Sequence, residues 1–519
     1  FSVGDGQDTI KDFTLSEDEV LFYNSLGQAL EDSQISKSAN SNGDAVFSIS
    51  DGTQVTLEGV SFYSVPFYGG SLGHSSGDLI VSADTEVTSE ISGIIVINYG
   101  EGSVLVDANA AILTGSDQQT QGDGYGIGFT SPSGSDVIIK SENVVGQCRG
   151  ISAVSGGTGF LSISATGDIE TTSEQVDGVL EVAGLYTSNS GSGIKIDILG
   201  GVTSNGRGIS ALNSGSGDTV ISVSGNVSAV KDRGIYADND QEGSEARDIK
   251  INANNVTAFN HAITAINNDQ GNNEITITGL VETRGDEESG VASFKASTEL
   301  NVSSSGIVKG YTGIGTDLYS DNVTVDGTVI ALGGNAIDTY GADDILTLGL
   351  TAKVTGLMHG GSGSDTVNFA ISKSEVEGFV YDEAENTLTI STADESYDFK
   401  SFEYIKFADD RDALPIASSV NALKENLANR MSLQDKLNEL QAKYDALIAQ
   451  YSEALARISE LEAQLAELKS EQKEEQTYDS KSFREVISKD IAEYIKDAED
   501  TQLVELYNTI SDNEAVYNE

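Results

Sequence analysis

The chain has 519 residues, and its 82 Asp and Glu residues against 29 Lys and Arg residues give a formal net charge of −53. This charge argues against nucleic acids and anionic membranes as partners, because both would be repelled. The single cysteine, Cys148, excludes an internal disulfide, and no stretch approaches the ~18 apolar residues that span a bilayer, so no membrane insertion is expected.

Residues 1 to about 75 begin with a loop rich in Gly and Asp, Gly4 to Ile10, and continue as short alternating strands. Asp5 and Asp8 of this loop are candidate Ca²⁺ ligands, because carboxylates next to glycine carbonyls offer hard oxygen donors. The chain opens inside this motif and shows no signal-peptide pattern, so we expect a piece of a longer protein.

Residues about 76 to 370 carry an internal repeat in which a small residue precedes an aliphatic one. The repeated pairs are Gly93-Ile94, Gly126-Ile127, Gly150-Ile151, Gly184-Leu185, Gly208-Ile209, Gly234-Ile235, Ala262-Ile263, Gly290-Val291, Gly313-Ile314 and Ala336-Ile337. They recur every 23 to 34 residues, separated by Gly/Ser/Asn/Asp turns and short strands of period two.

Three short strands in each repeat are typical of a three-faced β-solenoid. We therefore predict a mainly β fold, a right-handed parallel β-helix whose inward side chains stack from coil to coil. A series of β-sandwich domains is the alternative, but it would show no such fixed recurrence.

The clearest motif is Gly360 to Asn368, which fits the nine-residue pattern G-G-x-G-x-D-x-U-x at every defined position. Gly360, Gly361 and Gly363 permit a tight turn that exposes main-chain carbonyls, and Asp365 adds a carboxylate. Ca²⁺, which takes roughly six to eight oxygen ligands, suits such a segment.

A degenerate copy of this motif, Gly341 to Ile345, makes Asp343 and Asp344 further candidate ligands, for which a solvated turn is the alternative. Other turns also carry an aspartate, and we interpret these as ordinary β-turn residues: Asp136, Asp218 and Asp248.

The chain after the repeat divides into three parts. Residues 371–415 resemble the first zone again and predict a second β-hairpin module. Residues 416–475 contain apolar residues from Leu433 to Leu468 at alternating spacings of four and three, which predicts a coiled coil. Ile448 and Leu455 widen this apolar face, so a trimer or larger bundle is one option and a helix docked on its own chain is the other. Residues 476–519 predict short helices.

The Gly360–Asn368 motif and the partial copy at Gly4–Ile10 resemble the repeats-in-toxin family of bacterial proteins exported by type I secretion. Phe47–Leu57 resembles the hairpin that follows a calcium β-roll in that family, and Thr387–Phe407 repeats the arrangement. The repeat between them is similar to the β-helical passenger regions of bacterial autotransporters. The resemblance covers about residues 1 to 410 and implies an extracellular or cell-surface location and bound Ca²⁺. A β-roll site takes loops from two successive coils, so a solitary motif supplies half of one.

Signatures of catalysis are sparse. The three histidines, His74, His261 and His359, match no catalytic or metal-ligand spacing, and Cys148 reads as a small buried residue. A β-helical polysaccharide lyase or hydrolase remains an alternative, since carboxylates and aromatic residues occur on the expected flanks. These candidates are Asp238 and Asp240 beside Arg233, Asp286, Glu287 and Glu288 near Arg284, and Tyr186, Tyr236, Tyr311 and Tyr319.

These patterns together predict a secreted, calcium-dependent structural protein of the bacterial cell surface rather than an enzyme. An S-layer, matrix, filament or adhesin component would fit. We expect self-association through the solenoid ends or the Leu433–Leu468 helix, and surface glycans are further candidate partners. A spike-like glycan-binding adhesin is an alternative.

Overall fold

The computed structural model describes residues 7–10, 35–39, 44–49, 53–61, 71–74, 78–83, 85–89, 92–114, 124–173, 182–239, 247–268 and 271–471. Residue contacts divide the chain into two units, Phe1–Leu423 and Lys424–Glu519. Most described residues of the first unit are β-strand, and those of the second belong to a single α-helix.

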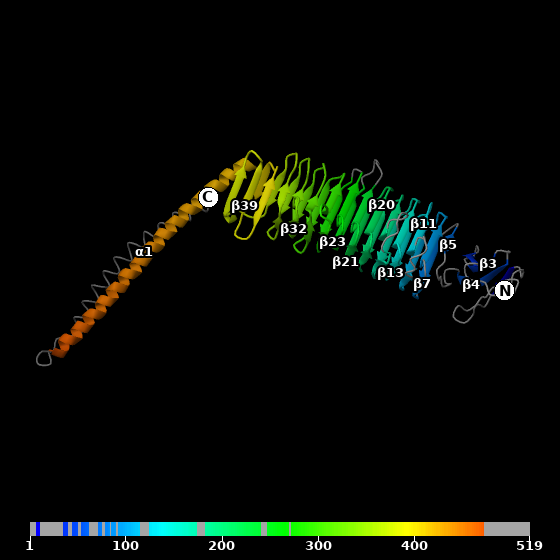
Figure 1. Ribbon diagram of the computed structural model, residues 1–519, viewed down its shortest axis with the longest axis horizontal. Helices are drawn as coiled ribbons and strands as arrows, with labels where there is room; N and C mark the ends of the chain where they lie inside the picture. Colours follow the sequence, from blue (N-terminus) through cyan, green and yellow to red (C-terminus); the bar gives the residue numbers. More distant parts are fainter. Residues whose placement is uncertain are drawn as a thin grey trace. The chain divides into compact units, whose positions relative to one another are not determined.

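The first unit contains a parallel β-solenoid of about ten turns, as the repeat predicted. Figure 1 shows its strands side by side, from β5 and β7 through β20 and β32 to β39. One coil runs through β17 (Ala183–Asn189), β18 (Ile194–Ile198) and β19 (Val202–Ser204), and each pairs in parallel with its equivalent in the next coil. We call the faces that contain these strands the first, second and third face.

The remaining strands of the three faces have the following bounds. The first face contains β5 (Ser71–His74), β8 (Ile94–Asn98), β11 (Tyr125–Ser131), β14 (Arg149–Ser155), β20 (Arg207–Asn213), β22 (Ile235–Asn239), β24 (Ile263–Asn267), β27 (Ser289–Phe294), β30 (Thr312–Gly315), β33 (Ile337–Asp338) and β36 (Leu357–His359). The second face contains β6 (Leu79–Ala83), β9 (Val104–Ala108), β12 (Val137–Ser141), β15 (Leu161–Ala165), β25 (Asn273–Ile277), β28 (Thr298–Val302), β31 (Asn322–Val325), β34 (Ile345–Leu348), β37 (Thr366–Phe369) and β41 (Tyr404–Phe407). The third face contains β7 (Val87–Ser89), β10 (Ile112–Thr114), β13 (Val144–Gly146), β16 (Ile169–Thr171), β26 (Leu280–Thr283), β29 (Ile307–Gly310), β32 (Thr328–Ala331) and β35 (Lys353–Thr355); β21 (Thr219–Ala229) and β23 (Ile249–Ala258) span the second and third faces.

The repeated small–aliphatic pairs begin the first-face strands. Their aliphatic members stack in register from Ile94 to Ile337 and are almost fully buried. The residue before each aliphatic one must be small, because the backbone of the next coil and a core side chain approach it closely. A Cβ on Gly150 would lie 2.4 Å from Cγ2 of Ile169 and 2.7 Å from the carbonyl O of Gly184. The repeat is therefore the signature of the core itself.

A separate four-stranded sheet precedes the solenoid, with strands β1 (Gln7–Ile10), β4 (Gln54–Ser61), β3 (Asp44–Ile49) and β2 (Ile35–Ala39) in that order. Asp8 lies in β1 with an exposed side chain, opposite Val55 of β4. Asp5 lies outside the described residues.

The C-terminal end of the solenoid is covered by its own chain. After β37 come a short 3-10 helix (Lys373–Glu375) and the antiparallel strands β38 (Gly378–Asp382), β39 (Thr387–Ser391) and β40 (Ser396–Lys400), and then β40 and β41 rejoin the first and second faces in parallel. Five aromatic rings gather here with neighbouring centroids 4.9 to 6.1 Å apart: Phe369, Tyr397, Phe399, Phe402 and Phe407.

The second-face edge beyond this aromatic cluster is also closed, whereas the first-face sheet ends at β38. Strand β42 (Leu414–Pro415) pairs antiparallel with β41, and Pro415 has no N–H with which to extend the sheet. Helix α1 (Ile416–Glu471) begins directly after it, and Ile416, Val420 and Leu423 are buried in the solenoid core.

Beyond Leu423 the helix continues without a break to Glu471, in agreement with the predicted helical tail. Its apolar 4–3 repeat is largely exposed on this single chain, so the coiled coil stays a prediction. The short helices expected over residues 476–519 lie outside the described residues.

Candidate functional site

The nine-residue motif forms the corner between the first and second faces in one of the last coils. Gly361 and Gly363 have φ values of +94° and +153°, where a Cβ is strained. A Cβ would also lie 2.0 Å from the carbonyl O of Tyr340 at Gly361, and 1.8 Å from that of Ala342 at Gly363. The glycines therefore let this corner stack directly on the preceding one, Tyr340–Asp344.

Carboxylates at this corner fall into two adjacent columns, because successive side chains of a strand point to opposite sides. The outer column includes Asp218, Asp248 and Asp343. Each of them immediately precedes the first residue of a second-face segment whose side chain points into the core. The Oδ1 atom of each accepts a hydrogen bond from the next coil: from Asp248 N at 3.0 Å, Asn272 N at 3.0 Å and Ser364 N at 2.9 Å. These aspartates therefore join coils rather than only forming turns.

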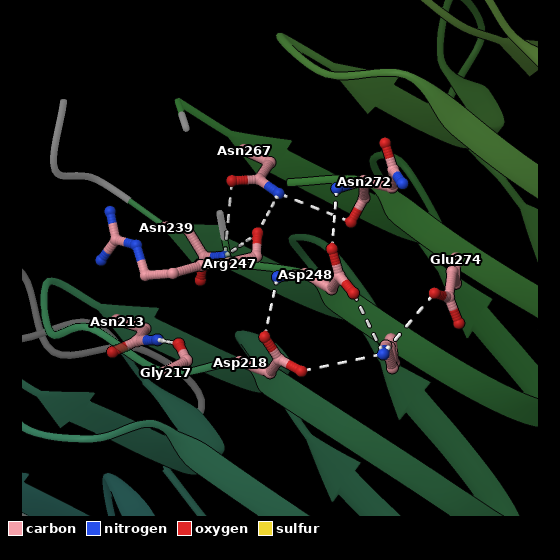
Figure 2. Close-up of polar contacts among 10 residues, drawn as sticks. Asn213, Gly217, Asp218, Asn239, Arg247, Asp248, Asn267, Asn272 and Glu274 are labelled. Carbon is pink, nitrogen blue, oxygen red and sulfur yellow. Dashed lines mark hydrogen bonds and ion pairs between the residues drawn. The ribbon is translucent and has the colours of Figure 1, made fainter. Parts of the chain in front are cut away.

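Figure 2 shows the outer column at Asp218, Asp248 and Asn272. Lys250 lies among its carboxylates, with Nζ 3.0 Å from Asp248, 3.7 Å from Asp218 and 3.6 Å from Glu274. The partial burial of Asp248 opposes ionisation, but the N–H of Asn272 and the Lys250 ammonium outweigh it and hold the pKa of Asp248 below its ordinary value. Asp218 and Asp248 of the outer column thus have a cation of their own, Lys250.

The inner column consists of Asp321, Asp344 and Asp365, whose side chains are 3%, 1% and 0% exposed. They occupy the inward register that Ile194 and Ile249 fill in earlier coils. The Oδ1 atoms accept hydrogen bonds from the preceding coil: from Thr298 N at 2.7 Å, Asp321 N at 2.8 Å and Asp344 N at 2.9 Å. Glu403 continues the series by accepting from Asp365 N at 2.9 Å.

The second oxygen of each inner aspartate, Oδ2, is buried and makes no hydrogen bond of good geometry. The Thr316 and Thr339 hydroxyls still lie close enough to Asp321 and Asp344, respectively, to lower the pKa values of these carboxyls. Burial is the largest cause that raises the pKa of Asp321 to about 7, of Asp344 to about 8 and of Asp365 to about 6, against smaller opposing effects of hydrogen-bond donors. Neighbouring carboxylates add to the shift, since Asp321 and Asp365 act on Asp344, and Glu403 acts on Asp365. Unpaired buried carboxylate oxygens are costly, so this column is suited to a cation.

These residues fit a hard cation only in combination with the main chain. Among the described residues, no group of three or more His, Cys, Asp or Glu side chains is arranged to hold a metal ion. A bound Ca²⁺ would therefore take Oδ2 atoms of the inner column together with carbonyl oxygens of the stacked corners Tyr340–Asp344 and Gly360–Asp365, a donor set that suits its preference for oxygen.

The earlier coils satisfy the same corner with amides instead. A buried column of Asn and Ser residues ends the first-face strands: Asn98, Ser131, Ser155, Asn189, Asn213, Asn239 and Asn267. Figure 2 shows Asn267 donating to the carbonyl O of Arg247, at 2.7 Å, and Asn213 donating to that of Gly217, at 2.5 Å. In the earlier coils, asparagine side chains thus donate to the carbonyl oxygens of this corner, whereas in the later coils the corner is lined by buried aspartates.

The structure separates the sequence candidates. Asp365 and Asp344 come together in the inner column; Asp344 is buried, so the solvated turn considered for it is wrong, because its strand register turns it inward. Asp343 lies in the outer column. Asp321 was missed, although it and Asp344 each follow a stacked isoleucine, Ile314 and Ile337, at the same distance in sequence.

Some of the candidates for a glycan cleft have partners within the solenoid, whereas Tyr311 and Tyr319 are exposed and Asp240 lies outside the described residues. The Arg149 guanidinium lies 3.9 Å from the Tyr186 ring centroid, and Arg207 and Arg233 lie 4.6 and 4.8 Å from that of Tyr236. Two further pairs involve the histidines: His261 Nε2 lies 2.9 Å from Glu288, and His359 Nδ1 lies 3.1 Å from Asp338. Cys148 is buried, as predicted.

No protein-family model matches this chain, and no curated protein and no solved structure is significantly similar to it. The part of the chain that the structure describes includes no helix long and apolar enough to cross a membrane.

Proposed function

We propose that this chain is a structural or adhesive component of a bacterial cell surface, secreted and locked into its folded form by Ca²⁺. The observation that carries the proposal is the column of buried carboxylate oxygens at Asp321, Asp344 and Asp365 that make no hydrogen bond of good geometry. The resemblance of Gly360–Asn368 to repeats-in-toxin motifs supports both the ion and the export route.

The mechanism is folding coupled to metal binding. With no bound cation, burying ionised inner carboxylates is unfavourable, and the net charge of −53 adds repulsion across the chain. Ca²⁺ supplies positive charge at the inner column and stabilises the folded state to a degree set by the ratio of its free concentration to its dissociation constant. A protein of this kind would stay loosely folded where Ca²⁺ is scarce and become rigid outside the cell.

Titration calorimetry of the full chain with Ca²⁺ tests this proposal. We expect binding that the combined D321N/D344N/D365N variant loses and the control D218N/D248N variant keeps, because the control column already has Lys250. Equal binding by the control and the inner-column variant would refute the inner column as the site. Light scattering before and after Ca²⁺ reports whether binding also drives assembly.

A polar groove favours a second candidate function, glycan binding without catalysis. The outward sides of β21, β23 and β25 form a groove of about 390 Å³ lined by Ser222, Ser224, Asn252, Asn254, Thr276 and Thr278 together with Val223 and Ala253. These side chains present uncharged donors and acceptors, which suit a neutral polysaccharide better than an anionic one. Retardation of the chain on neutral polysaccharide gels, relieved in S222A/N252A/T276A, would support this function, and equal mobility of both proteins would contradict it.

A further inference from the structure

Helix α1 presents an apolar stripe that its own described chain leaves open. Leu437, Tyr444, Tyr451, Leu461 and Leu468 are between 42% and 58% exposed. In heptad terms Leu437 and Tyr444 are a positions, and Leu440 and Leu447 are d positions. The stripe continues in this register to Leu468, so a partner of matching length and period would cover it.

The charges beside the stripe discriminate between the two directions that a partner helix can take. The g positions from 436 to 464 are Lys436, Lys443, Gln450, Arg457 and Gln464, and none is acidic. An antiparallel pair of identical helices sets g against g′, and with the two stripes overlapping end to end it would place Lys443 opposite Arg457. Like charges at such positions are destabilising.

A parallel, in-register pair instead sets each g position beside the e′ position of the following heptad. Arg457, which pairs with Glu460 of its own helix, then also faces Glu462 of the other helix, an attractive contact. Lys443 faces Ile448, whose side chain its methylene stem can cover. No like-charged g–e′ pair arises between residues 436 and 469.

A second copy of this chain is therefore the occupant that the charges favour. At the C-terminal end of the solenoid, Pro415 and the buried start of α1 close the second-face edge, which disfavours association through that edge. We propose that α1 binds other copies of this chain in parallel and in register through the Leu433–Leu468 stripe, an inference that goes beyond the calcium-locked solenoid.

A charge-swap series on the full chain tests the orientation. R457E and E462R should each raise the concentration at which light scattering detects half-assembly, by about tenfold, because each places like charges at the g–e′ contact. The double variant R457E/E462R should recover most of that loss, because only the Arg457–Glu460 ion pair within the helix is not restored. If the double variant is no better than the singles, the parallel register is wrong.

Cysteine cross-linking is a second, independent test of the relative direction of the helices. Leu433 and Leu468 are d positions about 50 Å apart along the helix, at roughly 1.5 Å per residue. In the parallel register, L433C and L468C should each form disulfide-linked dimers on their own under mild oxidation. A449C, on the opposite side of the helix at an f position, is the matched control, and Cys148 is buried.

The outcomes are distinct. Disulfides that form only when L433C and L468C are mixed would show antiparallel pairing and overturn the proposal, as would a monomer at every concentration. A monomer that still binds Ca²⁺ would leave the calcium-locked solenoid standing. A parallel oligomer that binds no Ca²⁺ would instead support the helix pairing and count against the proposed function.

Discussion

Asp344 gives the sharpest test of the inner column, because its substitution should stabilise the metal-free protein while weakening its response to Ca²⁺. Burial raises the pKa of this carboxyl to about 8, whereas an unfolded aspartate ionises near pH 4. Because the folded-state pKa is raised, the free energy of unfolding is highest below about pH 4, where Asp344 is protonated in both states. It falls as the pH rises from about 4 through about 8. The metal-free solenoid should therefore weaken steadily between these limits.

The magnitude follows from the pKa difference. At pH 7 ionisation of Asp344 lowers the free energy of unfolding by about 4 kcal/mol relative to its value at low pH, taking ~1.36 kcal/mol per pH unit as an upper bound. The amide introduced by D344N has nearly the same shape as the carboxyl. It keeps the Oδ1 acceptor for Asp321 N and removes the charge, but its NH₂ group must then be satisfied, at a cost of about 1–3 kcal/mol. The net expected gain in EGTA at pH 7 is about 1–3 kcal/mol.

Urea unfolding in EGTA, followed by circular dichroism at pH 5, 7 and 8, measures this difference. D344N should raise the midpoint at pH 7 and 8, lose the advantage at pH 5, and gain less from added Ca²⁺ than wild type. The control D248N removes an outer carboxylate paired with Lys250 and should cost at most about 1 kcal/mol. If D344N lowers the EGTA midpoint at pH 8 while keeping the full Ca²⁺ gain, the reasoning about the inner column is refuted.

Three further predictions concern the corners. G361A should destabilise the protein by more than about 2 kcal/mol in urea unfolding, because its Cβ would meet Tyr340 O at a positive φ, whereas G378A, with nothing within 4 Å, should change little. N267A should cost about 1–3 kcal/mol in the same assay, because it leaves the buried Arg247 carbonyl without this donor, and N252A on the exposed face should be nearly neutral. Ca²⁺ affinity measured by calorimetry should rise between pH 6 and 8, since the inner carboxyls must lose protons to bind; an affinity independent of pH would contradict the raised pKa values.

The fold could be predicted from the sequence because stacking of the coils requires the same pair of residue types, one small and one aliphatic, in each coil. Gly150 and Ile151 recur as a pair since the backbone of the next coil excludes a Cβ at one position and the core demands an aliphatic residue at the other. The carboxylate site was accessible only in part. Asp365 stands in a complete motif, but the role of Asp321 depends on strand register, which a single turn does not reveal.

The inward or outward direction of a corner aspartate is decided by one residue of register. Asp343 and Asp344 are neighbours in sequence, yet one joins the outer column and the other the core. A shift of one residue reverses the two faces of a strand, so composition alone cannot separate them. The amide column that ends at Asn267 was missed for a related reason, because asparagine is common in turns of every kind, where its side chain bonds the local backbone.

The position of the inner column beside the C-terminal cap leads to a final prediction about where the solenoid is stabilised. In a stack where each coil contacts only its neighbours, local stability depends on the nearest interfaces, and an end coil has one fewer. The inner column continues to Glu403, next to the aromatic cluster of the cap, so Ca²⁺ would tie the cap to the last coils. Hydrogen exchange should therefore show that removing Ca²⁺ deprotects β34, β37 and β40 together, while β17 and β20, whose corner is held by Asn189 and Asn213, keep their protection. Uniform deprotection of all coils would instead mean that the cation acts through net charge and not through this column.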